Sequence, residues 1–267
     1  MSESLKVVVV GATGKMGQAI SHQVHVDTSL ELFAAIDLES SGRIGKDVGE
    51  LIGLNTGIKI SSDFESSLEA ADAVIDFTRP EASLKFIELC ARNNVAYVLG
   101  TTGFSDQEKI LITELSTKIP ICFSPNMSIG VNVLISLTEK ATKILQHDYD
   151  IEIIESHHKF KKDAPSGTAI KLGEEIADQL GRTNKDFVFD RQQQVSERKK
   201  TDIGFSSIRG GNIAGEHTVI FHGEHESIEV THRAFNRKIF SDGAVNASIW
   251  LSLQENGYYD FKDLLKS

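Results

Sequence analysis

The chain has 267 residues, of which 40% are hydrophobic and 25% are charged. These proportions are typical of a globular protein, and the length suits one large domain or two of ordinary size. Asp and Glu outnumber Lys and Arg by 38 to 28, so the formal net charge is −10. An acidic surface argues against nucleic acid or an anionic membrane as a partner, and any anionic ligand needs a local cluster of cations.

The N-terminus has neither the charged start nor the long apolar stretch of a signal peptide, and no apolar run reaches the length of a membrane span. The two cysteines, Cys90 and Cys122, stand in no CxxC or Cys/His pattern. We therefore expect them to be buried, reduced thiols, and we expect a cytoplasmic protein with no membrane partner.

Strands and helices alternate through the first half of the chain. The β-branched run Leu5–Val10 does not alternate with polar residues, which predicts a strand buried on both faces of a parallel sheet. A helix is expected over Lys15–Val26, another begins at Pro80, and a third has Ser105 as its cap with Glu108 three residues later. This order predicts an α/β fold with a Rossmann-type doubly wound parallel sheet. The other strands are expected at Leu32–Ile36, Ala73–Phe77, Val95–Leu99 and Ile119–Phe123.

The pattern changes after residue 127. Helices are expected over Ile129–Leu145 and Ser166–Leu180, with a strand over Tyr149–Ser156 between them. From about Lys185 to Arg233 the chain has strand-like segments with little helix, which favours a mixed or antiparallel sheet. The polar run Asp190–Asp202 is expected to be an exposed, mobile loop.

These patterns predict two domains. Residues 1–127 form the Rossmann domain, which residues 238–267 complete with a last helix over Asp242–Leu253. Residues 128–237 form a second α+β domain that carries the mixed or antiparallel sheet.

A glycine motif follows the first strand and opens the first helix. Gly11, Gly14 and Gly17 have the spacing GxxGxxG. Glycine lets the main chain approach a pyrophosphate, and a helix N-terminus offers N–H groups and a positive dipole end. Asp37 closes the second strand, where an acidic residue binds the adenosine ribose hydroxyls. The motif predicts a dinucleotide site. The alternatives are a glycine turn that only packs helix on strand, or a site for FAD.

Two later loops also follow strands of this sheet. They read GTTG at Gly100–Gly103 and SPNM at Ser124–Met127. Ligands of open α/β sheets bind beyond the carboxyl ends of the strands, so these loops are candidates to contact the nicotinamide ribose and carboxamide. Each loop, taken alone, also fits ordinary turn chemistry.

Positive and titratable groups are concentrated in the segment ESHHKFKKDAPSGTA, residues 155–169, and a predicted helix start lies within it. Clustered cations beside a helix N-terminus form a receptor for carboxylate or phosphate, and histidines can exchange protons near neutral pH. The alternative is a solvated basic turn. The cluster consists of His157, His158, Lys159, Lys161 and Lys162, followed by Ser166, Gly167 and Thr168.

A metal site is the second alternative for this segment. Glu155 and the histidines at 157, 158, 217, 222 and 225 are the available ligands. They form no HExxH or comparable spacing, and the adjacent lysines repel a cation. We therefore expect no metal.

The motifs resemble those of the 4-hydroxy-tetrahydrodipicolinate reductase family, also called dihydrodipicolinate reductases. The family signature E-[SA]-H-H-x-x-K-x-D-A-P-S-G-T-A is met from Glu155 to Ala169. The blocks VGATGKMG, GTTG, SPNMSIGVN, GEHTV and FSDGAVNASIWL resemble the same family and occur in the expected order.

The resemblance implies a reductase that transfers hydride from NADH or NADPH to 4-hydroxy-tetrahydrodipicolinate, a cyclic dicarboxylate. The product is tetrahydrodipicolinate, on the route to diaminopimelate and lysine. It also implies a substrate site in the smaller domain and a homotetramer built through that domain's sheet. The competing interpretations are another reductase of a small anionic substrate, or a non-catalytic NAD(H)-sensing regulator, which needs no HHxxK cluster.

The resemblance also assigns roles to residues. His157 matches a proton donor and acceptor, Lys161 a second proton donor, and His158 a substrate contact. Many relatives have Arg after the acidic residue, whereas this chain has Leu38, which argues against a strong preference for NADPH. The carboxylate cradle matches Ser166, Gly167 and Thr168. The cofactor contacts match Gly11, Ala12, Thr13, Gly14, Lys15, Met16, Asp37, Gly100, Thr101, Thr102, Ser124, Pro125, Asn126 and Met127.

Overall fold

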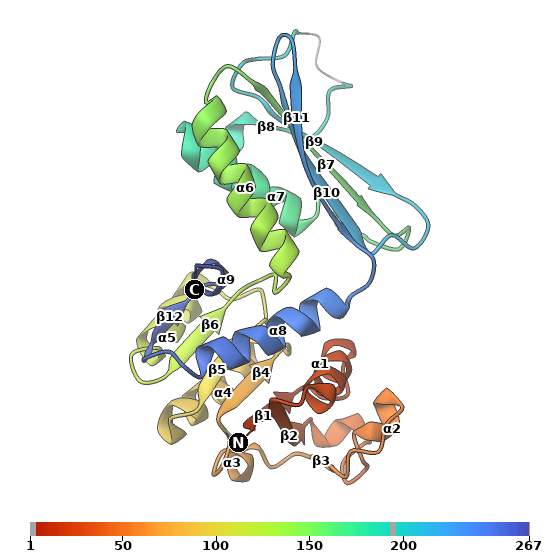
Figure 1. The fold of residues 1–267 in the computed structure, drawn as a ribbon, viewed down its shortest axis with the longest axis vertical. Helices are drawn as coiled ribbons and strands as arrows, with labels where there is room; N and C mark the ends of the chain where they lie inside the picture. Colours follow the sequence, from red (N-terminus) through yellow and green to blue (C-terminus); the bar gives the residue numbers. More distant parts are fainter. Residues whose placement is uncertain (1–3, 193–195, 267) are drawn as a thin grey trace. The chain divides into compact units, whose positions relative to one another are not determined.

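The computed structural model describes residues 4–192 and 196–266. The chain forms two compact units (Figure 1). The first unit comprises Met1–Ser128 and Lys238–Ser267, and the second comprises Ile129–Arg237. No helix in the described residues has the length and hydropathy needed to cross a membrane.

Among the described residues, seven strands of the first unit form one sheet, in the order β12-β6-β5-β4-β1-β2-β3. Every neighbouring pair is parallel. The predicted doubly wound parallel sheet is therefore confirmed. The direction of strand addition reverses between β1 and β4, which is the point where such sheets bind ligands. The strands are β1 (Leu5–Val10), β2 (Leu30–Ile36), β3 (Ile60–Ser61), β4 (Ala73–Asp76), β5 (Ala96–Leu99), β6 (Pro120–Phe123) and β12 (Gly257–Tyr259).

Helices cover both faces of this sheet. They are α1 (Lys15–Val26), α2 (Gly49–Ile52), α3 (Phe64–Ser67), α4 (Pro80–Asn93), α5 (Asp106–Leu115), α8 (Lys238–Leu251) and α9 (Phe261–Leu264). Val7 and Val9 of β1 pack in one cluster with residues of α1 and α8. Val8 and Val10 pack in another cluster with residues of α4 and α5. Strand β1 is thus buried on both faces, as its uninterrupted apolar sequence predicts.

Local signals placed several helix ends correctly. Pro80 is the first residue of α4, and Ser105 forms a capping box with Glu108 at the start of α5. Cys90 and Cys122 are buried free thiols, as expected. The last long helix, α8, begins at Lys238, four residues before the predicted start. Strand β12 and helix α9 follow it and were not predicted, since a three-residue strand gives no readable period.

The second unit contains a mixed sheet, as predicted. Its strand order in the described residues is β11-β10-β7-β9-β8. Strand β10 is antiparallel to β7 and β11, whereas β9 is parallel to β7 and β8. The strands are β7 (Asp150–His157), β8 (Phe187–Val188), β9 (Ile203–Arg209), β10 (Gly215–His222) and β11 (Ser227–Ala234), and the helices are α6 (Ile129–Leu145) and α7 (Gly167–Leu180).

The polar run Asp190–Asp202 precedes β9. Residues 193–195 of this run lie outside the described residues, and most of its described positions are exposed. Arg191 pairs with Glu152 of β7 at 2.6 Å, and Arg198 lies 2.7 Å from Asp150. Ion pairs therefore link the described parts of the run to β7.

One face of the second sheet changes from apolar to polar residues along β7. Successive residues of a strand point to opposite faces, so Ile151, Ile153, Glu155 and His157 share one face, and all four are buried. The first two pack with residues of α6 and α7 in the core of this unit. The apolar core therefore continues into buried polar residues on the same face.

The neighbouring strands β9 and β10 also change from apolar to polar residues, at the positions that pair with those of β7. Ile153 pairs with Phe205 of β9 and Val219 of β10, which are apolar core residues. Two residues further along, Glu155 pairs with Ser207 and His217. Strand pairing thus gathers polar side chains from three strands at one end of the core.

The close packing of α8 gives a test of the first unit. A Cβ added at Gly243 would lie 1.6 Å from the carbonyl oxygen of Met127, so main chain must move to admit it. Gly→Ala within an open helix stabilises by roughly 0.8–1 kcal/mol. Here we expect the opposite sign, with Gly243→Ala lowering the free energy of unfolding by about 1–3 kcal/mol, as measured by chemical denaturation.

Gly210→Ala is the matched control, because a Cβ there meets nothing within 4 Å. This variant should stay within about 0.5 kcal/mol of the wild type. Wild-type or higher stability of Gly243→Ala would contradict the packing described for α8.

Candidate active site

The glycine motif forms a tight turn between β1 and α1. Gly11 has φ +68°, a conformation that favours glycine. A Cβ on Gly17 would lie only 2.1 Å from the carbonyl oxygen of Gly11, so α1 packs directly against the turn. Gly14 caps α1 without a side-chain hydrogen bond. Glycines thus stand in the turn, at the N-cap and in the first turn of α1, an arrangement that fits the pyrophosphate of a dinucleotide.

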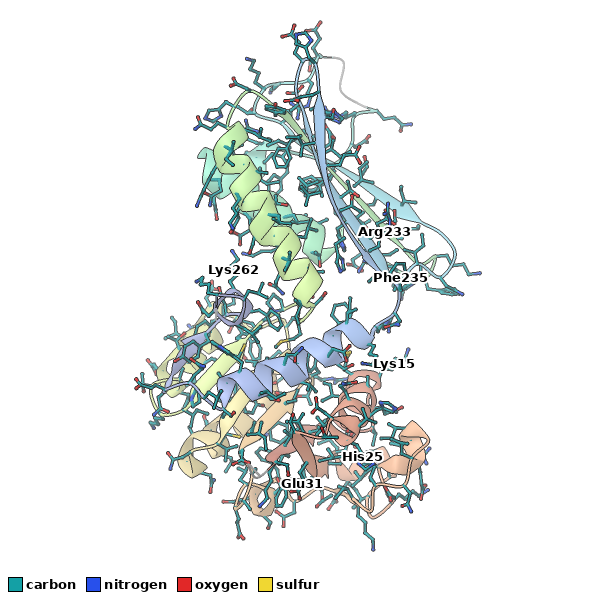
Figure 2. The ribbon with its side chains drawn as sticks, viewed as in Figure 1. Lys15, His25, Glu31, Arg233, Phe235 and Lys262 are labelled. Atoms are coloured by element: carbon teal, nitrogen blue, oxygen red, sulfur yellow. The ribbon has the colours of Figure 1, made fainter. Side chains whose placement is uncertain are left out.

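Asp37 ties the end of β2 to this turn. Its Oδ2 accepts the backbone N–H of Thr13 at 2.7 Å, and its Oδ1 accepts that of Leu38 at 2.7 Å. Leu38 is 67% exposed, and the side chains of Lys15 and Arg43 are exposed as well (Lys15 is labelled in Figure 2). The predicted ribose-binding carboxylate therefore lies beside the glycine turn.

The loop after β5 is shaped by a buried polar network. The Oγ1 of Thr101 accepts the backbone N–H of Thr78 at 2.9 Å and lies 3.3 Å from Oδ1 of Asp76. Asp76 is fully buried and also accepts the hydroxyl of Tyr97 at 2.7 Å. The hydroxyl of Thr101 is thus engaged within the protein, whereas Thr102 is exposed.

The loop after β6 also satisfies its own polar groups. The Oγ of Ser124 donates to the backbone carbonyl of Asn126 at 2.8 Å, and Oδ1 of Asn126 accepts the N–H of Ser128 at 2.9 Å. Met127 is buried and Pro125 is exposed. The predicted cofactor residues follow β1, β2, β5 and β6. They therefore meet at the carboxyl edge of one parallel sheet.

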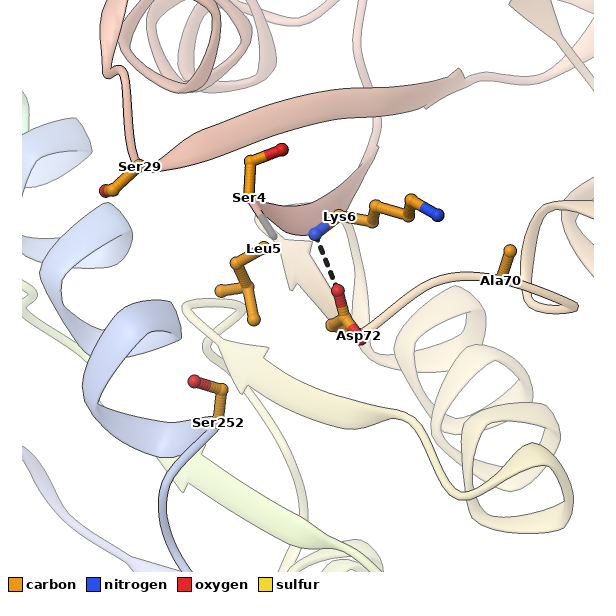
Figure 3. Close-up of a pocket in the computed structure, with 7 residues that line it drawn as sticks. All are labelled: Ser4, Leu5, Lys6, Ser29, Ala70, Asp72 and Ser252. Carbon is orange, nitrogen blue, oxygen red and sulfur yellow. Dashed lines mark hydrogen bonds between the residues drawn. The ribbon is translucent and has the colours of Figure 1, made fainter. Parts of the chain in front are cut away.

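A pocket lies at the opposite edge of the same sheet, where the strands begin (Figure 3). Leu5, Ser29 and Asp72 line it, and they lie at or just before the first residues of β1, β2 and β4. Asp72 accepts the backbone N–H of Lys6 at 2.7 Å. None of the predicted site residues lines this pocket, so it is separate from the carboxyl-edge site.

A buried carboxylate organises the polar end of the second sheet. Glu155 is 1% exposed, and its two oxygens accept hydrogen bonds from Arg209 at 2.7 and 2.8 Å. Oε2 also lies 2.5 Å from Nδ1 of His157, and Oε1 accepts the backbone N–H of Ser166 at 3.2 Å. Burial by itself raises the pKa of Glu155, but hydrogen bonds from Arg209, Ser207 and His157 outweigh it and lower that pKa to about 2. Glu155 is therefore ionised near neutral pH.

Two histidine rings lie beside this carboxylate. The ring centroids of His157 and His217 are 5.2 Å apart in an edge-to-face arrangement. Burial lowers the pKa of His217 to about 3, so His217 is neutral near neutral pH, and its Nε2 lies 2.9 Å from Oγ of Ser166. Burial also lowers the pKa of His157, but there the Glu155 carboxylate opposes the effect. Of the two rings, His157 is therefore the one suited to exchange a proton.

The predicted basic cluster separates into two groups. Lys161 is 21% exposed, and its Nζ pairs with Asp163 at 2.7 Å. Its charge lowers the pKa of His157, in addition to the larger effect of burial, so the two groups interact. Lys159 and Lys162 are instead exposed. Of the three predicted cations of the cluster, only Lys161 is partly enclosed.

Helix α7 begins as predicted. Ser166 is its N-cap, and its Oγ accepts the backbone N–H of Ala169 at 3.2 Å. Gly167 is exposed, and a Cβ there would meet nothing within 4 Å, so the first turn is open to a ligand. The Nδ1 of His158 is buried and has no hydrogen-bond partner among the described residues. Both features suit the recognition of a carboxylate.

Three residues of this site were not predicted to act in it. The sequence patterns gave no role to Arg209 and considered Glu155 and His217 only as metal ligands. The described residues contain no group of three or more His, Cys, Asp or Glu side chains that could hold a metal ion. Along residues 151–157, successive side chains alternate between the two faces of the strand. This alternation, which places Glu155 on the same face as Ile151 and Ile153, was the sequence signal that could have identified Glu155. Arg209 lies 54 residues from Glu155, and only strand pairing brings the two together.

Comparison with known proteins gives consistent results along the whole chain. Residues 5–127 match the model of the N-terminal part of dihydrodipicolinate reductase, and residues 130–265 match that of its C-terminal part. A 4-hydroxy-tetrahydrodipicolinate reductase from Chromobacterium violaceum is 45% identical, and the alignment covers 98% of each chain. One from Cupriavidus pinatubonensis is 44% identical over 98% of this chain and 99% of its own.

A solved structure shares the fold of both units. It is a dipicolinate-bound dihydrodipicolinate reductase from a Paenisporosarcina species, with a TM-score of 0.79 and 27% identity. The match covers 97% of this chain and 98% of that one. The chain belongs to the dihydrodipicolinate reductase family and is an NAD(P)H-dependent oxidoreductase.

Proposed function

We propose that this chain reduces 4-hydroxy-tetrahydrodipicolinate to tetrahydrodipicolinate, in the biosynthesis of diaminopimelate and lysine. The observation that carries the proposal is the pairing of His157 with the buried Glu155 beside the open N-terminus of α7. One relative of known structure binds dipicolinate, a dicarboxylate. A small dicarboxylate fits a site that combines a partly enclosed lysine with a helix N-terminus.

The net reaction consumes one hydride and one proton and releases one water. The C4 hydroxyl leaves together with a proton from C3 as this water, which creates a C3=C4 double bond in the ring. NAD(P)H supplies the hydride when bound. Hydride addition at C4 of the ring builds negative charge at C3, which then needs a proton. We assign this proton to His157, with Lys161 as the second proton donor. The positive charge of Lys161 also stabilises the charge that develops during the reaction.

Substrate binding is assigned to the start of α7 and its surroundings. Ser166, Gly167 and Thr168 form the carboxylate cradle, and His158 supplies a further contact. The buried, unpartnered Nδ1 of His158 supports this role, because a ligand satisfies an otherwise costly polar atom. The hydrogen bond to the buried His217 holds the side chain of Ser166 in place within the cradle.

Cofactor binding is assigned to the carboxyl edge of the first sheet. The glycine turn holds the pyrophosphate and Asp37 binds the adenosine ribose. The loops after β5 and β6 contact the nicotinamide half, where Thr101 contributes through its backbone because its hydroxyl is engaged. The assigned residues are Gly11, Ala12, Thr13, Gly14, Lys15, Met16, Asp37, Gly100, Thr101, Thr102, Ser124, Pro125, Asn126 and Met127.

We also propose a cytoplasmic homotetramer built through the second sheet. The face of this sheet opposite α6 and α7 includes Ile154 and Ile208, and Ile208 is 51% exposed. Phe235, just after β11, is 90% exposed (Figure 2). Exposed apolar side chains of this kind are typical of surfaces that associate.

The substrate assignment is tested by following NADH absorbance with enzymatically generated 4-hydroxy-tetrahydrodipicolinate. We expect rapid oxidation of NADH with this substrate and little with a panel of 2-oxo acids. Because the cradle recognises carboxylates, pyridine-2,6-dicarboxylate should inhibit competitively with substrate. Oxidation only with a 2-oxo acid would favour another reductase, and no oxidation with any compound would favour an NAD(H) sensor.

The proton-transfer roles predict the behaviour of two variants. His157→Gln and Lys161→Ala should each lower kcat by about 10²–10⁴, the usual contribution of one general acid or base. Cofactor affinity, measured by NADH fluorescence titration, should change little. Lys162→Ala is the control, because that side chain is exposed next to Lys161. Near wild-type turnover in both variants would refute the assignment.

Cofactor preference depends on the residue after Asp37. A 2′-phosphate brings about two negative charges against this carboxylate, and Leu38 offers no compensating charge. We expect NADH to be used at least as well as NADPH, and Leu38→Arg to raise kcat/KM for NADPH relative to NADH. Leu38→Gln, which adds a polar side chain without charge, is the control.

The measurement is kcat/KM for both cofactors at fixed ionic strength. A wild-type preference of more than about tenfold for NADPH, or about 1.4 kcal/mol, would contradict this prediction. It would indicate that Lys15 or Arg43 binds the phosphate.

A further inference from the structure

We propose that Glu155, held by Arg209, is a positioning residue for His157. Its carboxylate fixes the proton on Nδ1 of His157, turns Nε2 toward the substrate and keeps the ring able to carry a second proton. This inference rests on the proposed role of His157 and adds Glu155 and Arg209 to the residues on which the reaction depends.

The carboxylate of Glu155 is held by contacts to both of its oxygens. Oε1 accepts hydrogen bonds from Arg209 and from the backbone N–H of Ser166. Oε2 accepts one from Arg209 and contacts Nδ1 of His157. Since Glu155 is ionised and can only accept, Nδ1 must be the protonated nitrogen of the neutral ring. Nε2 is then the nitrogen that takes up and releases a proton.

Nε2, the second ring nitrogen of His157, lies next to β10. This atom has no hydrogen-bond partner within the described part of the chain. Gly215 of β10 lies next to it, and a Cβ there would be 3.2 Å from Nε2. Gly215 therefore places no side chain over this nitrogen. A ring that is held through Nδ1 and has an unpartnered Nε2 is oriented for proton exchange with a ligand.

Charged groups of both signs lie around the ring of His157. Four titratable or charged groups face His157: Glu155 on its own strand, Lys161 in the following loop, Arg209 on β9, and His217 on β10. His217 is neutral near neutral pH. Without Glu155, two cations and no anion would face the ring, and protonated His157 would be strongly disfavoured. The carboxylate therefore partly offsets burial and the neighbouring cations, although burial still lowers the pKa of His157.

The ion pair of Glu155 and Arg209 also joins parts of the site that lie apart along the chain. Arg209 donates to both oxygens of Glu155 and to the carbonyl oxygen of Asp163 at 2.6 Å. Asp163 in turn pairs with Lys161, and Ser166 bonds to Glu155 at the start of α7. The ion pair between the buried Glu155 and the partly exposed Arg209 thus links β7, the loop that carries Lys161, and the cradle.

The charge is tested with Glu155→Gln, which keeps the shape of the side chain. The test titrates the imidazole Cε1–H signal of His157 by NMR, assigned by its absence from His157→Gln. Removing the carboxylate should lower the pKa of His157 by roughly 1–3 pH units. Because protonated His157 is the donor, kcat/KM falls as pH rises through this pKa, and the fall should move to lower pH in the variant. An unchanged titration would overturn the proposal.

Orientation is tested with Glu155→Asp, which keeps the charge for Arg209 but shortens the side chain by one methylene. We expect kcat to fall by at least about tenfold, and by no more than the roughly 10²–10⁴-fold that one general acid contributes. The affinity for NADH should be unchanged. Wild-type kcat in this variant would overturn the positioning role. This variant also decides the matter if Glu155→Gln does not fold.

Glu152→Gln is the matched control. Glu152 lies on the same strand and pairs with Arg191 and Arg198, but it points to the opposite face. If these ion pairs only stabilise the strand, substitutions of Glu155 and Glu152 should have similar effects. If Glu155 positions His157, the titration of His157 should be unchanged in Glu152→Gln. The NMR titration needs no substrate. It therefore tests this proposal even if the chain reduces a different compound.

Discussion

The ionised carboxylate of Glu155 is the interaction on which the second unit's site depends. A buried charge is costly unless it is paired and its hydrogen-bonding capacity is met, and here a two-pronged arginine, a histidine and a helix-cap amide meet it. The same contacts fix the ring of His157, the start of α7 and the loop between them. Loss of the Arg209 charge would leave the buried Glu155 carboxylate without its cationic partner, so the contacts at the polar end of this sheet depend on one another.

Strand register explains why this cluster forms where it does. The face that packs on α6 and α7 is apolar at Ile153 and its partners and becomes polar at Glu155 and its partners, two residues further along. The rigid core thus fixes the backbone directly under the polar residues. The first unit follows a comparable rule, because its parallel strands bring the glycine turn, Asp37 and two loops to a single edge.

Features that depend on short stretches of sequence were predictable. The buried strand β1, the glycine turn, the capping box at Ser105 and the cap at Ser166 each follow from a few adjacent residues. Features that depend on distant pairing were not. Arg209 became part of the site only through the pairing of β7 with β9. The role of Thr101 was likewise hidden, because its hydroxyl bonds to Asp76 on another strand. Tertiary contacts determine the roles of these residues, and no local sequence pattern encodes such contacts.

The most direct test of the account is the tautomer of His157 in the unmodified protein. The ¹⁵N chemical shifts of its two ring nitrogens, measured near neutral pH, distinguish a protonated from an unprotonated nitrogen. Because the Glu155 carboxylate can only accept a hydrogen bond, the account predicts a proton on Nδ1 and a lone pair on Nε2 of the neutral ring. A neutral ring protonated on Nε2, or an even mixture of the two forms, would contradict it.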